Sequence, residues 1–302
     1  MFHPKPQNPV LAASLILLAT AFIAGTTLLA KALGTGALGP ALHPMQISHG
    51  RFIFAFMVIS TVVLLRRPDL TRPHWRLHIG RTSFGWLGVT LMFASVAYIP
   101  MSDATAIAFL NPVFAMMLAI PLLGERVGMV RWSAAGIAML GALILLRPTP
   151  ESFQPAALLA LGAALVMGME LIFIKKLSGR EPLLKILFFN NLIGVMIASL
   201  AVAPVWQPPT GLQWLALAGV GSLMACAQAA FVSGMARADA SFAAPFSYAT
   251  LVFAVMYDFL GFGQSPDLIS IIGASVILGG ALLLALREGR MLKNQSNTGA
   301  PT

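Results

Sequence analysis

Glu170 is an isolated carboxylate in an apolar stretch, with no Asp, Glu, Lys or Arg from Ser152 to Met169. Burial away from water disfavours the charged form of a carboxyl group, so a residue in this position can take up and release a proton. We therefore predict a ligand-binding and proton-coupling role for Glu170. A second interpretation is equally open, in which the carboxylate pairs with Lys175 or Lys176 at the end of a helix.

Other polar side chains also interrupt apolar stretches, and each needs a partner where it is buried. Arg51 precedes an apolar run and either anchors a helix end or contacts an anionic ligand. In Asn111-Pro112 the proline removes a backbone hydrogen bond and kinks a helix, so we predict that Asn111 lines a cavity. Pro245 predicts a corresponding kink later in the chain. The remaining polar candidates for ligand contact are Gln228, Ser247 and Tyr248.

Two aromatic side chains complete the set of candidate ligand contacts. Trp86 and Tyr98 lie in one apolar run and present rings that can stack on a planar ligand. The alternative is that these rings face lipid or the protein core.

The sequence lacks the motifs of metal-dependent and nucleotide-dependent enzymes. It has no His-Glu-x-x-His, no clustered Cys/His set and no Gly-rich loop with a following Lys, and its one cysteine, Cys226, lies in an apolar run. We therefore expect no catalytic residues, no metal site and no cofactor.

The composition indicates the kind of protein in which these candidate residues are placed. The chain is 58% hydrophobic and 10% charged, with a mean hydropathy of +0.85. Soluble domains carry about 25% charged residues, so this chain cannot cover itself with a surface suited to water. The net charge of +9 comes mainly from basic residues between apolar runs, which is a topology signal rather than a nucleic-acid signal.

The apolar runs predict an all-α membrane protein of ten transmembrane helices, because a span needs about 20 residues. The 51-residue run from 186 to 236 is divided by Pro204 to Gly211 into two spans. The predicted spans are 9–31, 45–65, 81–99, 103–123, 129–146, 155–174, 184–203, 212–234, 241–262 and 268–286.

The basic residues between these spans predict the orientation. With both termini in the cytoplasm, 16 of the 19 Lys and Arg residues lie on the inside, and only Lys31, Arg51 and Arg147 do not. A missed or additional span would destroy this alternation, so the distribution supports both the span count and the orientation.

The two halves of the chain resemble each other. Val113-Phe114-Ala115 recurs as Val252-Phe253-Ala254, and Gly141-Ala142-Leu143 recurs as Gly280-Ala281-Leu282, at one offset of 139 residues. Because five spans per half is an odd number, the second half enters the membrane from the opposite face. Such inverted repeats allow a central site to open alternately to each side, as carriers require.

These motifs also resemble a known family. Asp103-Ala104-Thr105-Ala106, Asn111-Pro112-Val113-Phe114-Ala115 and Leu123-Gly124-Glu125-Arg126 are similar to the EamA type of the drug/metabolite transporter superfamily, and the second half repeats the pattern from Ala238 to Gly280. One departure is Gln264, where the family commonly has Glu. The resemblance implies one five-helix repeat at 1–150, a second, inverted one at 151–290 and a disordered tail at 291–302. It also implies a central cavity walled mainly by spans 1, 3, 4, 6, 8 and 9.

We therefore predict a secondary transporter that moves a small organic metabolite across the bacterial inner membrane by alternating access. The substrate classes that the resemblance implies are amino-acid-like, S-adenosylmethionine-like and riboflavin-like. The alternative is a membrane-embedded lipid-modifying enzyme, which would show clustered ionisable residues near one face. The expected partners are the small-molecule substrate and membrane lipid, without nucleic acid. A homodimer, the direction of transport and the choice between proton coupling and exchange stay open.

Overall fold

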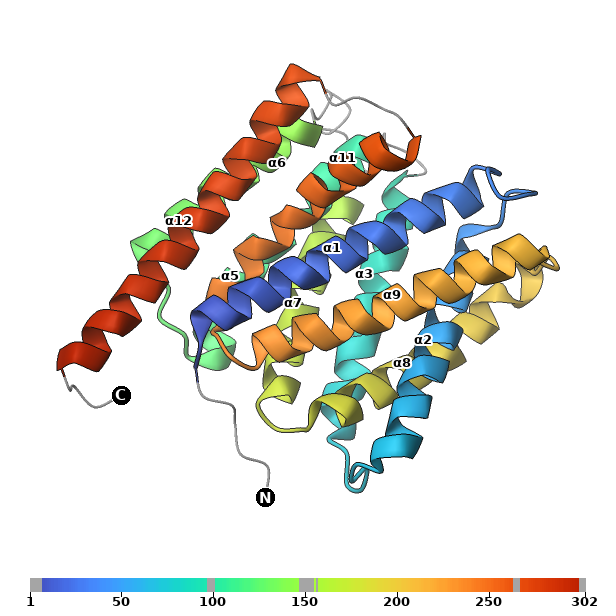
Figure 1. Ribbon diagram of the computed structural model, residues 1–302, viewed down its shortest axis with the longest axis horizontal. Helices are drawn as coiled ribbons and strands as arrows, with labels where there is room; N and C mark the ends of the chain where they lie inside the picture. Colours follow the sequence, from blue (N-terminus) through green and yellow to red (C-terminus); the bar gives the residue numbers. More distant parts are fainter. Residues whose placement is uncertain (1–6, 97–100, 147–154, 156, 263–266, 299–302) are drawn as a thin grey trace.

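A computed structural model describes residues 7–96, 101–146, 155, 157–262 and 267–298. All regular secondary structure in these residues is helical (Figure 1). The helices of the first half are α1 (Pro9–Gly34), α2 (Pro44–Arg66), α3 (Trp75–Val96), α4 (Met101–Ala108), α5 (Asn111–Leu123) and α6 (Met129–Leu146). Those of the second half are α7 (Ala157–Ser178), α8 (Leu183–Val202), η2 (Ala203–Val205), α9 (Gly211–Met235), α10 (Ala240–Ala243), η3 (Ala244–Tyr248), α11 (Ala249–Phe262) and α12 (Leu268–Thr298).

Many of these helices have the length and surface of membrane spans. Within the described residues, six are long and apolar enough to cross a membrane: Pro9–Gly34, Pro44–Arg66, Ala157–Ser178, Leu183–Val205, Gly211–Met235 and Ala240–Gly261. Shorter apolar helices cover Asn111–Leu123, Met129–Ile144 and Ile271–Leu284. Leu64, Leu65 and Leu200 are 74%, 78% and 81% exposed, which suits contact with lipid rather than water.

The fourth predicted span of each half is interrupted at a proline. In the first half the α-helix stops at Ala108 and resumes at Asn111, because Pro112 has no N–H to donate to the Ala108 carbonyl four residues earlier. The Asn111 side-chain amide donates to that carbonyl instead, at 3.0 Å. In the second half, Pro245 lies in the 3₁₀ segment η3 between α10 and α11. The α-helix is therefore interrupted at both positions where the sequence predicts a kink.

Helices of one half pack mainly against helices of the other. α1 packs against α9 and α11, while α3 and α5 pack against α7, and α6 packs against α12. Since α7 and α9 occupy the places in the second half that α1 and α3 occupy in the first, these contacts are reciprocal. Figure 1 shows α1 beside α9 and α6 beside α12, with the start of α1 and the end of α12 at the same end of the bundle.

Polar contacts tie loops to helices at both ends of the bundle. At one end, Gln46 Nε2 donates to the Gln207 carbonyl at 2.5 Å, and Gln213 Nε2 donates to the Pro40 carbonyl at 2.6 Å. At the other end, Lys185 Nζ donates to the Thr71 carbonyl at 2.6 Å. At both ends a side chain donates a hydrogen bond to a backbone carbonyl of a distant loop. The donors are uncharged amides at one end and a lysine at the other.

Glu181, in the loop between α7 and α8, makes a further polar connection, with three hydrogen-bonded contacts. Its carboxylate accepts from the backbone N–H of His74 at 2.6 Å and lies 2.6 Å from His74 Nδ1 and 2.7 Å from His78 Nε2. Burial raises the pKa of Glu181, but the hydrogen bonds from the two histidines outweigh it, so its pKa lies below the ordinary value. The cluster fixes the start of α3 to the α7–α8 loop.

A second polar cluster joins the halves near α10. The Glu125 carboxylate accepts from the backbone N–H groups of Ala240 and Ser241 at 2.8 and 2.9 Å, and from Ser241 Oγ at 2.6 Å. Arg131 Nη1 donates to Asp239 at 3.0 Å. Glu125 therefore caps the first turn of α10, where N–H groups without a partner inside the helix favour an anion. Gln264, the corresponding residue of the other half, lies outside the described residues.

Two helix ends differ from the sequence prediction. α3 begins at Trp75 rather than at 81, so Arg81 lies about 9 Å along the helix. α12 continues to Thr298, through most of the segment expected as a disordered tail from 291. The Arg, Glu, Lys and Gln residues that follow the apolar part of α12 are good helix formers and allow this continuation.

Candidate functional site

A cavity of about 430 Å³ lies between α2, α3, α7, α8 and α9, with Ile23 of α1 and Asn111 of α5 also in its wall. This volume is within the range of small-molecule sites, roughly 300–1,000 Å³. Its position is set by the cross-packing of the two halves, because helices of both halves contribute to the wall.

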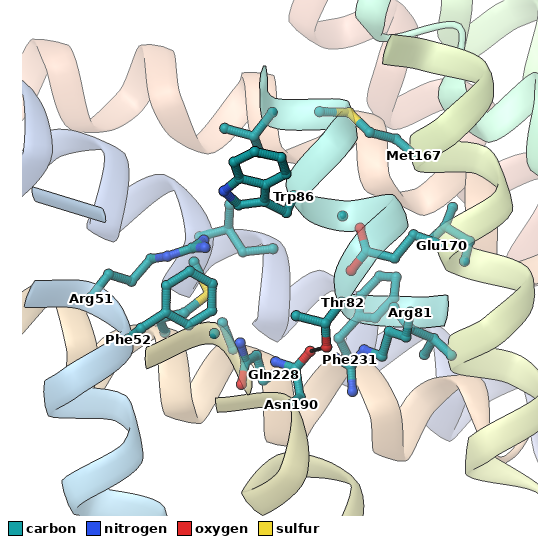
Figure 2. A pocket seen from close by; sticks show the side chains of 18 of the residues that line it. Arg51, Phe52, Arg81, Thr82, Trp86, Met167, Glu170, Asn190, Gln228 and Phe231 are labelled. Atoms are coloured by element: carbon teal, nitrogen blue, oxygen red, sulfur yellow. Dashed lines mark hydrogen bonds between the residues drawn. The ribbon is translucent and has the colours of Figure 1, made fainter. Parts of the chain in front are cut away.

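Three charged side chains line the cavity among the described residues: Arg51, Arg81 and Glu170. In Figure 2, Arg51 of α2 and Glu170 of α7 point toward each other from opposite walls. The Arg51 guanidinium carbon lies 4.4 Å from the centroid of the Phe52 ring, a distance suited to a cation–π contact. Arg81 of α3 is 3% exposed. Two guanidinium groups against one carboxylate leave the lining with an excess positive charge.

The charges that act on Glu170 are those of Arg81 and Arg51. Lys175 is used elsewhere, since its Nζ donates to the Met235 carbonyl at 2.9 Å and to the Ala238 carbonyl. Lys175 therefore contacts the end of α9 rather than Glu170, and pairing of Glu170 with Lys176 stays a prediction. The carboxylate faces the cavity instead of a helix end.

Amides and a hydroxyl form the polar part of the wall. Thr82 Oγ1 donates to Asn190 Oδ1 at 3.4 Å, the hydrogen bond drawn in Figure 2. Asn191, fully buried on α8, donates from Nδ2 to Gln228 Oε1 and to the Leu187 carbonyl, both at 2.8 Å. These bonds connect α3, α8 and α9 at the cavity and give it fixed polar groups.

Aromatic rings and methionines supply the rest of the wall. Trp86, Phe52 and Phe231 line the cavity together with Met167 and Met224. Figure 2 places the Trp86 ring above the Arg51 guanidinium. An indole beside a guanidinium and a carboxylate can bind a planar molecule through its face and its polar edge. Within the described residues, no three His, Cys, Asp or Glu residues are grouped so that they could hold a metal ion.

Comparison with known proteins places this architecture in a family. The sequence model of the EamA-like transporter family matches residues 10–147 and 154–286. The chain belongs to this family. The two matched segments are the two halves that the internal repeat indicates.

Individual relatives of this EamA-like transporter carry functional names. The chain is 31% identical over 233 residues to the riboflavin transporter of Vibrio cholerae, covering 76% of this chain and 78% of that protein. It is 27% identical over 259 residues to the S-adenosylmethionine uptake transporter of Rickettsia bellii, covering 85% and 89%. The EamA-like chain is therefore a small-metabolite transporter, a multi-pass protein of the bacterial inner membrane.

A solved structure supports the fold of this EamA-like transporter. A crystal structure of a protein with 21% sequence identity superposes with a TM-score of 0.78, covering 95% of this chain and 99% of its own. At this level of identity the similarity shows the shared fold and nothing further.

Five of the eight predicted site residues of the EamA-like transporter line the cavity: Arg51, Trp86, Asn111, Glu170 and Gln228. Tyr98 lies outside the described residues. Ser247 and Tyr248 are in η3, which contributes no described residue to the cavity wall. Tyr248 is fully buried, and its ring stacks on Phe109 with centroids 5.9 Å apart. Its surroundings are apolar side chains of α6, α11 and α12.

Several cavity residues are not among those predicted from the sequence. The predicted span begins at Arg81, so the sequence assigns this residue to the cytoplasmic charges. Thr82 and Asn190 are not among the predicted ligand contacts, and the family resemblance does not imply α2 or α8 in the cavity wall. One signal was present in the sequence: Thr82, Trp86 and Val89 follow each other at four and three residues, which is the spacing of one helix face, and all three line the cavity.

Proposed function

We propose that this chain is a ten-span secondary transporter that carries one small organic metabolite by alternating access, and that it is not an enzyme. The cavity carries the proposal: three charged side chains, fixed amides and aromatic rings meet inside an apolar bundle built from two repeats. Arg51, Trp86, Asn111, Glu170 and Gln228 are the proposed substrate contacts, and Glu170 is the proposed proton-coupling residue.

The proposed topology is two inverted five-helix repeats with both termini in the cytoplasm. Counting α4 with α5, and α10 with η3 and α11, gives each half one broken fourth span. The reciprocal packing of α1 on α9 and of α3 on α7 is what an axis relating the halves would produce. The start of α1 and the end of α12 lie at one end of the bundle, as an even number of spans requires (Figure 1).

The proposed substrate is planar with a polar edge. The relatives named for riboflavin and S-adenosylmethionine support this class, since both compounds contain a flat heteroaromatic ring. Amino-acid-like compounds are the third class to test. In the cavity, the ring would lie against Trp86, while the amides of Asn190 and Gln228 would meet its polar edge.

The alternative of a lipid-modifying enzyme receives no support from the relatives or the cavity. Acid–base or nucleophilic catalysis needs a nucleophile with a base beside it, or two groups that divide the roles of acid and base. The described lining residues offer one carboxylate between two permanently charged arginines.

The test is uptake by the full chain in proteoliposomes, after a thermal-shift screen with riboflavin, S-adenosylmethionine and a set of amino acids. We expect at least one compound to raise the melting temperature and to enter the vesicles saturably. A Trp86→Ala variant should reduce that uptake, and Trp75→Ala, which alters an exposed tryptophan on the same helix, is the matched control. Stoichiometric chemical conversion of the bound compound, without net movement, would contradict the proposal.

A further inference from the structure

Arg81 is a buried cation whose hydrogen-bonding capacity is only partly used within the described part of the protein. Its side chain is 3% exposed, and both Nε and Nη1 have no hydrogen-bond partner. A guanidinium group keeps its charge under all ordinary conditions and offers five N–H donors. Leaving such donors unpaired in a buried position costs free energy, so their place in a cavity wall points to a ligand.

The neighbouring charges do not remove this excess. Glu170 is the carboxylate that acts on Arg81, and it acts on Arg51 as well. One carboxylate can balance one of the two guanidinium groups. The other ionisable groups packed nearby are occupied: Lys185 donates to the Thr71 carbonyl, His78 contacts Glu181, and Lys175 donates to carbonyls at the end of α9.

Arg51 and Arg81 differ in how far the protein already satisfies them. Arg51 stacks on the Phe52 ring, which partly compensates its charge. Arg81 has two buried nitrogens without a hydrogen-bond partner, Nε and Nη1, whereas Arg51 has one such buried nitrogen, Nε. Figure 2 shows the two side chains on opposite sides of the space below Trp86, so a ligand under the indole would lie between two cations.

We propose that Arg81, together with Arg51, binds an oxyanion group of the transported metabolite. The substrate is thereby a small planar molecule that carries a carboxylate or a phosphate. Charge-assisted hydrogen bonds from a guanidinium to either group are short and roughly twice as strong as those between neutral groups. This inference rests on the proposed transport function and narrows its substrate class.

The experiment compares matched compounds that differ by the oxyanion. The pairs are riboflavin 5′-phosphate with riboflavin, S-adenosylmethionine with decarboxylated S-adenosylmethionine, and nicotinate with nicotinamide. The first pair tests phosphate, and the other two test carboxylate. For at least one pair, we expect the full chain in proteoliposomes to take up the oxyanion-bearing member about tenfold faster, which corresponds to one good charge-assisted bond.

Variants then assign the preference to Arg81. Arg81→Gln should remove it, whereas Arg76→Gln, an exposed arginine on the same helix, should keep it. Arg81→Lys keeps the charge and loses the guanidinium geometry, so it should fold as the wild type does and bind the oxyanion member more weakly. This second variant separates a binding defect from a folding defect.

The outcomes separate this inference from the function on which it rests. Uptake of the members that lack the oxyanion at equal or higher rate overturns the inference and leaves the transport function intact. A preference that persists in Arg81→Gln also overturns it. Uptake of no compound in any pair overturns the proposed transport of planar metabolites, and the inference with it.

Discussion

The carboxyl group of Glu170 lies directly against Gly85 of the neighbouring helix: a Cβ built on Gly85 would be 2.9 Å from the carboxyl carbon and from both oxygens. Glu170 therefore occupies its place in the cavity only because position 85 has no side chain. Real Cβ atoms essentially never approach so closely, so any larger residue must displace the carboxylate.

Gly85→Ala should consequently reduce transport by about tenfold or more while leaving the protein folded. Overpacking costs roughly 1–3 kcal/mol, and the better helix propensity of alanine offsets about 1 kcal/mol of it. Gly162→Ala is the matched control, because its Cβ would meet Leu91 at an ordinary 3.6 Å. Equal uptake by the two variants, measured in proteoliposomes at equal protein content, would show that the position of Glu170 is not needed.

The helical architecture could be predicted from composition and local pattern. The lengths of the apolar runs predict where the long helices lie. Pro112 and Pro245 predict the interruptions in α4–α5 and at η3, because a missing N–H acts within one helical turn. Glu170 and Arg51 could be selected for the same kind of reason. A charge within an apolar run must have a partner or a ligand, wherever the rest of the chain lies.

Arg81 and Tyr248 show why the other parts of the candidate site could not be predicted from the sequence. From the sequence alone Arg81 is assigned to a loop, whereas in the structure it shares the cavity wall with Glu170 of α7, and this electrostatic interaction joins residues from different halves. From the sequence Tyr248 is predicted to contact the ligand through its polar group. In the structure α6 and α12 enclose its ring together with Phe109. In both cases the neighbour that decides the role is distant in sequence, so no local pattern contains it.

Asn111 should contribute to binding beyond its structural bond. Asn111→Ala removes the donor to the Ala108 carbonyl, which lowers the free energy of unfolding by about 1 kcal/mol, and also removes an amide from the cavity wall. Adding Pro112→Ala supplies an N–H that can reach the same carbonyl. We therefore expect the double variant to recover the melting temperature of the wild type and to keep a several-fold weaker substrate affinity. Recovery of affinity along with stability would make Asn111 a structural residue alone.

The Glu181 cluster should make stability depend on acid pH. Because the folded-state pKa of Glu181 is depressed, its contribution is present above the unfolded-state value of about 4.3 and is lost as pH falls through the folded-state pKa. The melting temperature of the wild type should exceed that of Glu181→Gln at neutral pH, and the difference should shrink below about pH 4. Arg180→Gln, an exposed change in the same loop, should show no such difference. If the difference in melting temperature stays constant across the pH series, the charge of Glu181 is not what stabilises the protein.

The orientation of the chain can be tested with reporters. With both termini in the cytoplasm, a fusion after Gln207 should place the reporter outside, and fusions after Arg72 and Gly179 should place it inside. These positions lie in loops at opposite ends of the bundle, beside the Gln46–Gln207 and His74–Glu181 contacts. Alkaline phosphatase and green fluorescent protein give complementary signals, since the first is active outside and the second inside. A cytoplasmic signal at Gln207 would refute the ten-span topology.

Glu170 should link substrate binding to a proton. Its carboxylate shares the cavity with Arg81 and Arg51, so a proton on Glu170 removes the negative charge that competes with a bound oxyanion for these arginines. Proton and anion then favour each other's binding, which lets a pH gradient drive accumulation. Glu170→Gln imitates the protonated state permanently: exchange of substrate across proteoliposomes should persist, while accumulation driven by an imposed pH gradient should be lost. Glu125→Gln is the matched control, because that carboxylate binds the start of α10 outside the cavity. A Glu170→Gln variant that still concentrates substrate in response to the gradient would exclude Glu170 as the coupling residue. The role of Glu170 would then be to balance the charge of the arginines.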